Sequence, residues 1–273
     1  MAIEQQSPGF ITPEWPAPVN VHALTTLRTG GYSSGSYKGF NLAAHTGDDA
    51  ATVLSNRALL REHFSLPAEP IWLQQVHSNR IIAADPDKIG DEADGSWTDR
   101  TGRVCAVMTA DCLPVLICNR QGSKVAAAHA GWRGLHAGVV TNAIRKLESD
   151  PAELMVWLGP AIGPRAFEVG AEVFRAFTDR NAENTSAFRR TGDQHWLCDL
   201  YQLARIELFN QGLTSVFGGN ECTFTDEQRF YSYRRDGDTG RMASLIWLAA
   251  VSYTHLTLPT TIKPWRCRWW GGR

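Results

Sequence analysis

The 273-residue sequence predicts an α+β fold: a single compact domain in which mixed β-sheets are flanked by helices. Three observations predict it. Short apolar strands recur with turns between them, and helical periodicities follow several of these strands at irregular intervals. The composition, with 43% hydrophobic and 20% charged residues, is that of a globular protein. Because hairpins alternate with strand–helix crossovers, we expect a mixed sheet.

The middle of the chain is the most regular part. Residues 103–110 and 115–118 have the apolar character of buried strands, residues 119–122 form a turn, and residues 124–129 form a third strand. A glycine turn begins at residue 131. Apolar positions then recur at helical spacing from residue 139 up to Asp150-Pro151, which ends the predicted helix.

The part of the chain after residue 150 also alternates short strands with helices. The predicted elements are a strand at 154–158, a turn at 159–164, a helix from about 168 to 178, a strand at 196–198, a helix at 200–210, a strand at 215–217 and a last strand at 242–249. Asp199 is suited to cap the helix at 200–210. The sequence contains neither GxGxxG nor GxxxxGK[ST], so nucleotide-binding folds are disfavoured.

Charge and cysteine usage exclude several classes of protein. Lys plus Arg is 27 and Asp plus Glu is 28, a net charge of −1, so we expect no nucleic-acid partner. No apolar stretch is long enough to span a membrane, and we expect no membrane partner. The six cysteines form no CxxC pair and follow no signal-peptide pattern, which predicts reduced thiols in the cytoplasm.

The composition changes near the C-terminus. Residues 251–273 carry four Lys or Arg and no acidic residue, and three of the tryptophans lie in the last nine positions. We therefore expect a catalytic domain over residues 1–250 and a non-native or disordered tail over residues 251–273. No internal repeat or linker divides the rest of the chain.

Three residues at strand ends are candidate metal ligands: His77, Cys112 and His129. If they converge, the N, S, N donor set is the one expected of catalytic zinc with a fourth position open. Copper is a second possibility, because Cu²⁺ also accepts imidazole and thiolate. Asp94 and Asp111 could orient a ligand imidazole or act as acid and base.

The same residues allow a metal-free reaction. Cys112 as nucleophile with His129 as base would make a thiol hydrolase, and their separation in sequence does not exclude that geometry. The remaining cysteines in the body of the chain are predicted to be small core residues, with Cys118, Cys198 and Cys222 in apolar strands and Cys105 beside buried neighbours.

Arginines near glycine turns are candidate anion-binding residues. The Gly131-Trp-Arg-Gly turn opens a helix, so Arg133 and free backbone N–H groups could hold a phosphate. Arg57 is another candidate. Further polar residues lie in glycine-bounded loops, where they could bind substrate or simply shape turns: Arg28, Asn41, His45 and Asp48.

Several segments resemble the YfiH family, also called laccase-domain or multicopper polyphenol oxidase proteins. They are Gln75-Val-His-Ser, Val107-Met-Thr-Ala-Asp-Cys-Leu-Pro-Val, Ala128-His-Ala-Gly-Trp-Arg-Gly, Trp157-Leu-Gly-Pro-Ala-Ile-Gly-Pro and Phe230-Tyr-Ser-Tyr-Arg-Arg-Asp. The resemblance covers about residues 14–248. It implies a compact mixed α/β domain and a metal held by His77, Cys112 and His129. It also implies phosphorolysis of purine nucleosides, with deamination of adenosine.

We therefore predict a zinc-dependent purine nucleoside phosphorylase with adenosine deaminase activity, whose partners are purine nucleosides and phosphate. The expected catalytic residues are Cys112, His129 and Asp111, and the expected substrate-binding residues are Arg28, Asn41 and Arg133. Alternatives are a Cys-His amidase or deamidase acting on a peptidoglycan precursor, a copper-dependent polyphenol oxidase, and a protein that binds a small molecule without turnover. Eight histidines are few for a laccase with several copper centres. The sequence predicts no oligomeric state.

Overall fold

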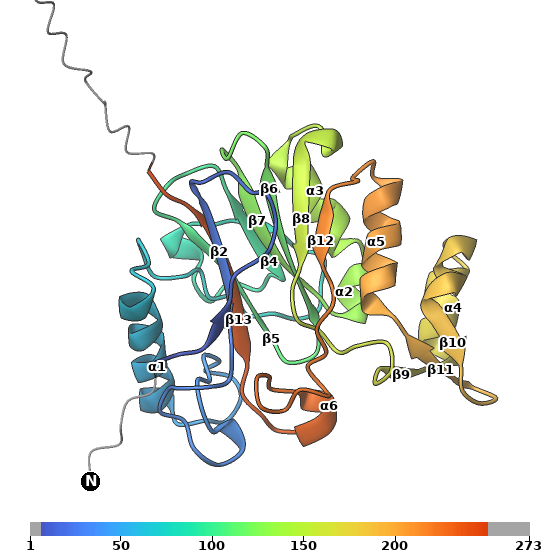
Figure 1. Ribbon diagram of the computed structural model, residues 1–273, viewed down its shortest axis with the longest axis horizontal. Coiled ribbons are helices and arrows are strands. Elements are labelled where there is room, and N and C mark those ends of the chain that lie inside the picture. Colours follow the sequence, from blue (N-terminus) through green and yellow to red (C-terminus); the bar gives the residue numbers. More distant parts are fainter. Residues whose placement is uncertain (1–6, 251–273) are drawn as a thin grey trace, which may run out of the picture.

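The computed structural model describes residues 7–250, which form three β-sheets and the helices around them (Figure 1). The six-stranded sheet has the order β12-β8-β6-β7-β4-β3, and the four-stranded sheet has the order β1-β2-β13-β5. A small third sheet has the order β10-β11-β9. The tail expected at residues 251–273 lies outside the described residues.

The strands of the six-stranded sheet are β3 (Ile82–Ala83), β4 (Gly95–Thr98), β6 (Leu113–Asn119), β7 (Val125–Ala130), β8 (Leu154–Leu158) and β12 (Val216–Gly218). Those of the four-stranded sheet are β1 (Phe10–Ile11), β2 (Val21–Thr26), β5 (Val104–Thr109) and β13 (Met242–Leu248). The small sheet contains β9 (Glu168–Gly170), β10 (Phe188–Arg190) and β11 (His195–Cys198). The α-helices are α1 (Ala50–His63), α2 (Trp132–His136), α3 (Val139–Leu147), α4 (Ala171–Thr178), α5 (Leu200–Asn210) and α6 (Tyr233–Asp236). Short 3₁₀ turns are η1 (Gly35–Tyr37), η2 (Pro86–Lys88), η3 (Pro151–Glu153) and η4 (Ala182–Ala187).

The two larger sheets pack face to face. Alternate side chains of β5, including Cys105 and Val107, pack against Leu116 of β6 and Ala127 of β7. Helix α1 covers the outer face of the four-stranded sheet, and α3 and α5 cover the outer face of the six-stranded sheet. Strand pairs β8–β12 and β3–β4 are parallel, whereas the other pairs are antiparallel. The predicted α+β class, with mixed sheets flanked by helices, is confirmed.

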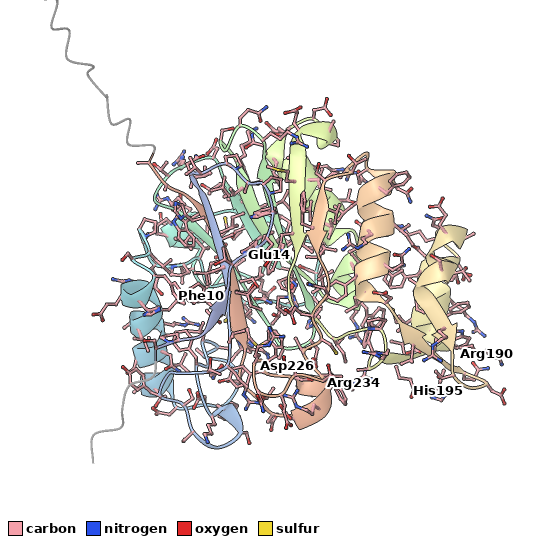
Figure 2. The ribbon with its side chains drawn as sticks, in the orientation of Figure 1. Phe10, Glu14, Arg190, His195, Asp226 and Arg234 are labelled. Carbon is pink, nitrogen blue, oxygen red and sulfur yellow. The ribbon has the colours of Figure 1, made fainter. Side chains whose placement is uncertain are left out.

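The small sheet and α4 form a projection beside the main body. Figure 2 shows Arg190 and His195 on the β10–β11 hairpin at its far end. An aromatic cluster packs α4 on the small sheet within this projection, with Phe174 stacked on Trp196 at a ring-centroid distance of 4.6 Å and Phe188 at 5.3 Å from Phe174. Its strand β9 leads back toward the end of the sandwich where β5 and β7 finish.

Most predicted elements are confirmed, and two helix predictions need correction. Helix α5 begins after Asp199, whose side chain accepts a hydrogen bond from the Gln202 N–H at 3.0 Å. The helix expected from about residue 168 begins only at residue 171, because residues 168–170 pair with β11 as strand β9. The helical stretch after Gly131 is divided into α2 and α3 at Gly138, which has a φ of +87°.

Three of the four cysteines assigned to the core are buried: Cys105, Cys118 and Cys198. The prediction for Cys222 is wrong. Cys222 lies in the loop after β12 and is partly exposed, and its sulfur accepts a hydrogen bond from the Gly163 N–H at 3.2 Å. Among residues 7–250, no helix has the length and apolar character needed to cross a bilayer.

Strands β5 and β7 finish at the same end of the sandwich. Cys105 and Val107 point between the sheets, so the next residue of that face in β5 is Thr109. Val125 and Ala127 of β7 also point between the sheets, and His129 is the next residue of that face in β7. The fold therefore presents Thr109 and His129 toward the space between the two sheets, where the candidate site lies.

Candidate active site

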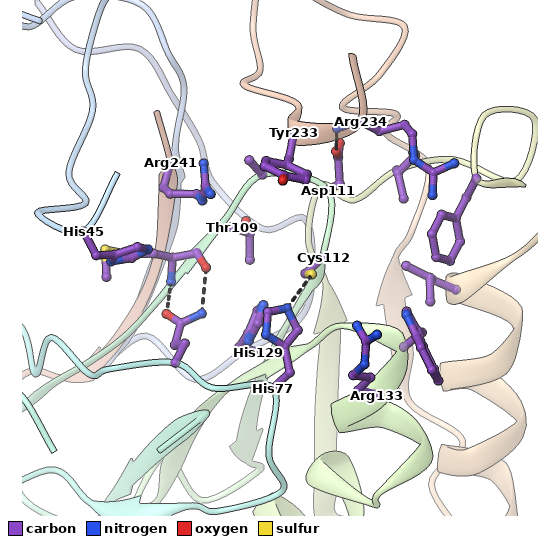
Figure 3. Close-up of a pocket in the computed structure, with 17 residues that line it drawn as sticks. His45, His77, Thr109, Asp111, Cys112, His129, Arg133, Tyr233, Arg234 and Arg241 are labelled. Atoms are coloured by element: carbon purple, nitrogen blue, oxygen red, sulfur yellow. Dashed lines mark hydrogen bonds between the residues drawn. The ribbon is translucent and has the colours of Figure 1, made fainter. Parts of the chain in front are cut away.

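His77, Cys112 and His129 converge in the folded chain. Their ligand atoms all lie within 4.8 Å of one another, and His77 Nε2 is 3.7 Å from Cys112 Sγ (Figure 3). His129 is buried at the end of β7, Cys112 is partly exposed in the β5–β6 turn, and His77 is exposed on the loop before β3. The three residues come from three separate segments, so only the fold brings them together.

Asp94 connects two of these segments. Its buried carboxylate lies 2.8 Å from His129 Nδ1 and accepts hydrogen bonds from the backbone N–H groups of Val76, His77 and Ser78. His77 has a φ of +61°, a left-handed conformation that is uncommon outside glycine. The bonds to Asp94 hold the loop in that conformation, and the bond to Nδ1 leaves the Nε2 of His129 to face the cluster.

Asp111 fixes the turn that carries Cys112. It also has a left-handed backbone, with a φ of +93°. Its Oδ1 accepts a hydrogen bond from the Thr223 hydroxyl at 2.6 Å, and its Oδ2 accepts one from the Arg234 N–H at 2.7 Å. Asp111 therefore lines the site while both of its carboxylate oxygens anchor distant loops.

Charge stabilisation favours a thiolate at Cys112. Burial alone would raise the pKa of this thiol, but the charges and hydrogen bonds of His129 and His77 outweigh burial and lower the pKa to about 6. Burial likewise opposes protonation of His129, whereas Cys112 and Asp94 favour it and raise the pKa of His129 to about 9. Without a metal, the pair is therefore a thiolate and an imidazolium at neutral pH.

The donor set fits a metal ion. Zinc lies at about 2.0–2.1 Å from imidazole nitrogen and about 2.3 Å from thiolate sulfur, so tetrahedral bonding separates N and S by roughly 3.5 Å. The 3.7 Å between His77 and Cys112 is close to that separation. The depressed pKa of Cys112 supplies the thiolate form that binds metals. Within residues 7–250 this is the one group of three His, Cys, Asp or Glu side chains close enough to hold a metal.

The cluster opens into a cavity of about 440 Å³. Its wall combines apolar side chains with three arginines, and Figure 3 shows Arg133 and Arg241 on opposite sides of the cluster. The lining residues include Trp132, Ile162, Phe167, Leu200 and Tyr233, together with His45, Thr109, Asp111, Arg133, Arg234 and Arg241. A cavity of this size, with apolar walls and a few polar groups, suits a small organic ligand.

The structure brings only some of the expected substrate-binding residues to this cavity. Arg133 lines it, with its guanidinium 4.5 Å from the ring centre of Trp132. Arg28 and Asn41 are absent from its described lining. Arg28 stacks on Tyr231 and donates to the Glu227 carbonyl at 3.1 Å.

Asn41 lies just behind the cavity. It is fully buried, and its Oδ1 accepts a hydrogen bond from the backbone N–H of Arg241 at 2.9 Å. Arg57 is also directed elsewhere, since its Nε donates to the Leu42 carbonyl at 2.9 Å and its guanidinium lies over Trp72. Asn41 therefore supports the wall of the cavity through Arg241.

Sequence reasoning assigned no function to Gln75, Tyr233, Arg234 or Arg241, all of which line the cavity. Gln75 makes two hydrogen bonds to the backbone of Met108, at 2.7 and 2.8 Å, and so fixes the end of β5. The sequence distinguishes the segments around residues 75 and 230–236 only through their resemblance to the family. Arg241 lies just before an apolar strand, and no local pattern marks it as a site residue.

Comparison with known proteins places the chain in a family. The family model described as multi-copper polyphenol oxidoreductase laccase matches residues 22–249. A protein of Escherichia coli named purine nucleoside phosphorylase YfiH is 50% identical over 240 residues, which cover 88% of this chain and 98% of the relative. A purine nucleoside phosphorylase of Pseudomonas aeruginosa is 51% identical over 241 residues, with the same coverage of both chains.

Two solved structures are similar to this chain over most of its length. The crystal structure of a Neisseria meningitidis protein matches with a TM-score of 0.86 and 48% identity, covering 89% of this chain and 100% of that one. The structure of YlmD from Geobacillus stearothermophilus matches with a TM-score of 0.84 and 28% identity, covering 90% and 98%. The chain, with its His77–Cys112–His129 cluster, is therefore a member of the YfiH family, the one described by the multi-copper polyphenol oxidoreductase laccase model.

Proposed function

We propose that this protein is a zinc-dependent purine nucleoside phosphorylase that also deaminates adenosine. The observation that carries the proposal is the His77–Cys112–His129 cluster at the edge of a cavity that also contains three arginines. Relatives about 50% identical over nearly their whole length are named purine nucleoside phosphorylases. The substrates would be a purine nucleoside, such as adenosine, inosine, guanosine or methylthioadenosine, and phosphate.

Phosphorolysis suits a cavity with both apolar and cationic walls. A phosphate oxygen attacks C1′ of the ribose, the bond from C1′ to the purine nitrogen breaks, and the base leaves with the electron pair and takes up a proton. Trp132, Ile162 and Phe167 offer an apolar wall for the flat base. Arg133, whose guanidinium lies over the Trp132 ring of that wall, offers hydrogen-bond donors to the nucleoside, and holding both reactants in one cavity lowers the entropic barrier.

The cluster would hold zinc through His77, Cys112 and His129, as proposed from the sequence. When bound, zinc supplies a Lewis acid with an open coordination position, and copper could occupy the same donors. Asp94 keeps the His129 ring oriented for this purpose. For deamination, water replaces the amino group at C6 of adenosine and ammonia leaves, a reaction that needs no phosphate.

Of the expected catalytic residues, Cys112 and His129 would act as ligands within the site. Both oxygens of Asp111 are already engaged, so we propose that it positions Thr223 and Arg234. We propose that Asn41 acts through Arg241 and that Arg28 supports the neighbouring loop through Tyr231. Free thiols at the five cysteines of the described chain suit a cytoplasmic setting.

The test is product analysis by mass spectrometry. Zinc-loaded protein is incubated with adenosine and phosphate, beside the Cys112→Ala variant. We expect adenine with ribose 1-phosphate, together with inosine and hypoxanthine, and we expect all of them to be lost in the variant. Unchanged adenosine with the zinc-loaded protein would overturn the proposal.

The second candidate function is a Cys-His hydrolase acting on an amide such as a peptidoglycan precursor. It is favoured by the pKa of about 6 at Cys112 and by the Asp94–His129 pair, which together resemble an activated thiol with an oriented base. It predicts amide hydrolysis by metal-free protein and first-order loss of that activity on alkylation of Cys112. A laccase with several copper centres is disfavoured, because the described residues contain one ligand cluster.

We also propose that residues 1–250 constitute the catalytic domain and that residues 251–273 are dispensable for it. The family model ends at residue 249, and the Neisseria structure is matched over its full length by 89% of this chain. Deleting residues 251–273 should leave the melting temperature and solubility unchanged. A marked fall in either would contradict this proposal.

A further inference from the structure

Thr109 places a hydroxyl without a hydrogen-bond partner in the wall of the cavity. Its side chain is 1% exposed, and its Oγ1 is buried and makes no hydrogen bond in the described chain. Figure 3 shows it between Arg241 and Cys112, above His129. A buried unsatisfied hydroxyl destabilises a fold, so its presence at the end of β5 points to a ligand that completes its hydrogen bonding.

Figure 3 shows Arg241 and Thr109 on the same side of the His77–Cys112–His129 cluster. Thr109 is paired with Met242 across the β5–β13 ladder, so Arg241 immediately precedes the strand residue opposite Thr109. Its Nη1 donates to the carbonyls of Thr239 and Gly240, at 2.6 and 3.1 Å. Among the described residues, no acceptor engages its Nη2 or Nε and no carboxylate pairs with it, so these N–H groups are available to a ligand.

The surroundings of Arg241 fix its position, and the acidic groups that interact with its charge include Cys112 and Asp111. Asn41 accepts a hydrogen bond from its backbone N–H, and Gln75 holds the adjacent end of β5. The neighbouring Asp111 has both oxygens engaged elsewhere. His45 lines the same side of the cavity and can donate an N–H, and burial, followed by the charge of Arg241, lowers its pKa.

We propose that Thr109, Arg241 and His45 form an oxyanion subsite for inorganic phosphate on the side of the cluster opposite Arg133. The subsite offers a hydroxyl, a guanidinium and an imidazole, which are the groups that bind a tetrahedral oxyanion. Arg133 and Trp132, over which its guanidinium lies, remain for the nucleoside. This inference rests on the proposed phosphorolysis for its function, but phosphate binding itself can be measured without any turnover.

The experiment separates binding from catalysis. Phosphate binding to the zinc-loaded full chain, without nucleoside, is measured by calorimetry for wild type, Thr109→Val, Thr109→Ser and Arg241→Gln. Loss of one hydrogen bond to a charged ligand should weaken phosphate binding about tenfold or more in Thr109→Val, whereas Thr109→Ser should retain it. Arg241→Gln should weaken binding at least as much. The KM for the nucleoside should change less than about twofold in Thr109→Val, while the KM for phosphate rises in parallel with the dissociation constant.

Ser96→Ala provides the matched control. Ser96 carries the other buried hydroxyl without a partner in the described chain, and it does not line the cavity. Both Thr109→Val and Ser96→Ala should raise the melting temperature of the ligand-free protein, because each removes an unsatisfied buried hydroxyl. Only Thr109→Val should weaken phosphate binding.

Three results would overturn the subsite. They are unchanged phosphate affinity in Thr109→Val, an equal loss of phosphate and nucleoside binding in that variant, and binding of adenosine monophosphate but not of inorganic phosphate to wild type. If phosphate binds as expected but no nucleoside is cleaved, the subsite stands and the proposed phosphorolysis fails. If the wild-type protein cleaves nucleosides but Thr109→Val binds phosphate with unaltered affinity, the proposed phosphorolysis stands and the subsite fails.

Discussion

Asp94 Oδ1 lies 2.8 Å from His129 Nδ1, and both side chains are buried. Burial would raise the pKa of Asp94, but its hydrogen bonds with His129 and Ser78 outweigh burial and lower it. Asp94 is therefore a carboxylate that accepts a hydrogen bond from Nδ1–H and keeps the proton of His129 on that nitrogen. The same carboxylate holds the backbone of His77, so one side chain positions two of the three proposed ligands.

Asp94→Asn should weaken zinc binding about 10- to 100-fold, which is the usual effect of removing a carboxylate behind a ligand histidine. The amide cannot accept all the hydrogen bonds that the carboxylate accepts from residues 76–78. Competition with a chromophoric chelator measures the affinity. Asp91→Asn is the control, since Asp91 is partly exposed and pairs only with Arg80 and Lys88. Equal zinc affinities of Asp94→Asn and wild type would show that Asp94 does not position the proposed ligands.

Alkylation of metal-free protein should report the low pKa of Cys112. The thiolate is the reactive form, so the rate at Cys112 should rise as the pH increases through about 6 and level off above about 7.5. In His129→Ala the midpoint should move upward toward the ordinary thiol value of about 8.5. Peptide mass spectrometry must assign the label, because Cys222 is also partly exposed and its pKa is also lowered.

Cys105 and Cys118 serve as internal controls for that experiment. Both are buried, and burial raises the pKa of each to about 12, so neither should be labelled in the folded protein. A wild-type midpoint near 8.5 at Cys112 would show that His129 and His77 do not stabilise its thiolate. Zinc should protect Cys112 specifically, and protection that was equal at Cys222 would argue against the ligand assignment.

Gly131 leaves room for the cluster. Its φ of −63° suits any residue, but a Cβ built there would lie 2.9 Å from Cys112 Sγ and 2.9 Å from His77 Cδ2. Gly131→Ala should therefore displace these side chains at a cost of about 1–3 kcal/mol, which corresponds to roughly 5- to 150-fold in zinc affinity. Gly192→Ala, whose Cβ would meet His195 only at 3.9 Å, is the control. Zinc titration measures the affinity of both variants. Unchanged zinc affinity in Gly131→Ala would show that a Cβ at residue 131 fits beside the cluster without displacing its side chains.

Cys112 and His129 could be predicted from sequence because each follows a recognisable local pattern, whereas His77 lies on a loop and not at the end of a strand as expected. His129 ends an alanine-rich strand, and Cys112 lies in the turn between two apolar strands. Arg241 carries no such mark, because its place in the site depends on the pairing of Met242 with Thr109 across more than a hundred residues. Cys222 was misplaced for a related reason: its neighbours in sequence are not its neighbours in space, and a loop contact with Gly163 determines its surroundings.

Asn41 distinguishes a supporting residue from a binding residue. Its side chain accepts hydrogen bonds from the N–H groups of Ala43 and Arg241 and donates to Thr46 and Asp48, all within a fully buried position. Asn41→Ala should lower the free energy of unfolding by about 2–3 kcal/mol, because it leaves buried donors and acceptors unpaired. Urea denaturation measures this loss.

The kinetics of Asn41→Ala then separate the two functions. If Asn41 acts by holding Arg241, the KM for phosphate rises while the KM for the nucleoside stays constant. If it contacts the nucleoside, as the sequence suggested, the nucleoside KM rises instead. Asn184→Ala controls for instability, because Asn184 is also buried and donates to the Phe177 carbonyl in the α4 region, away from the described cavity lining. It should destabilise the protein and leave both KM values unchanged. A parallel rise of both KM values in Asn184→Ala would show that lost stability alone explains the effect at Asn41.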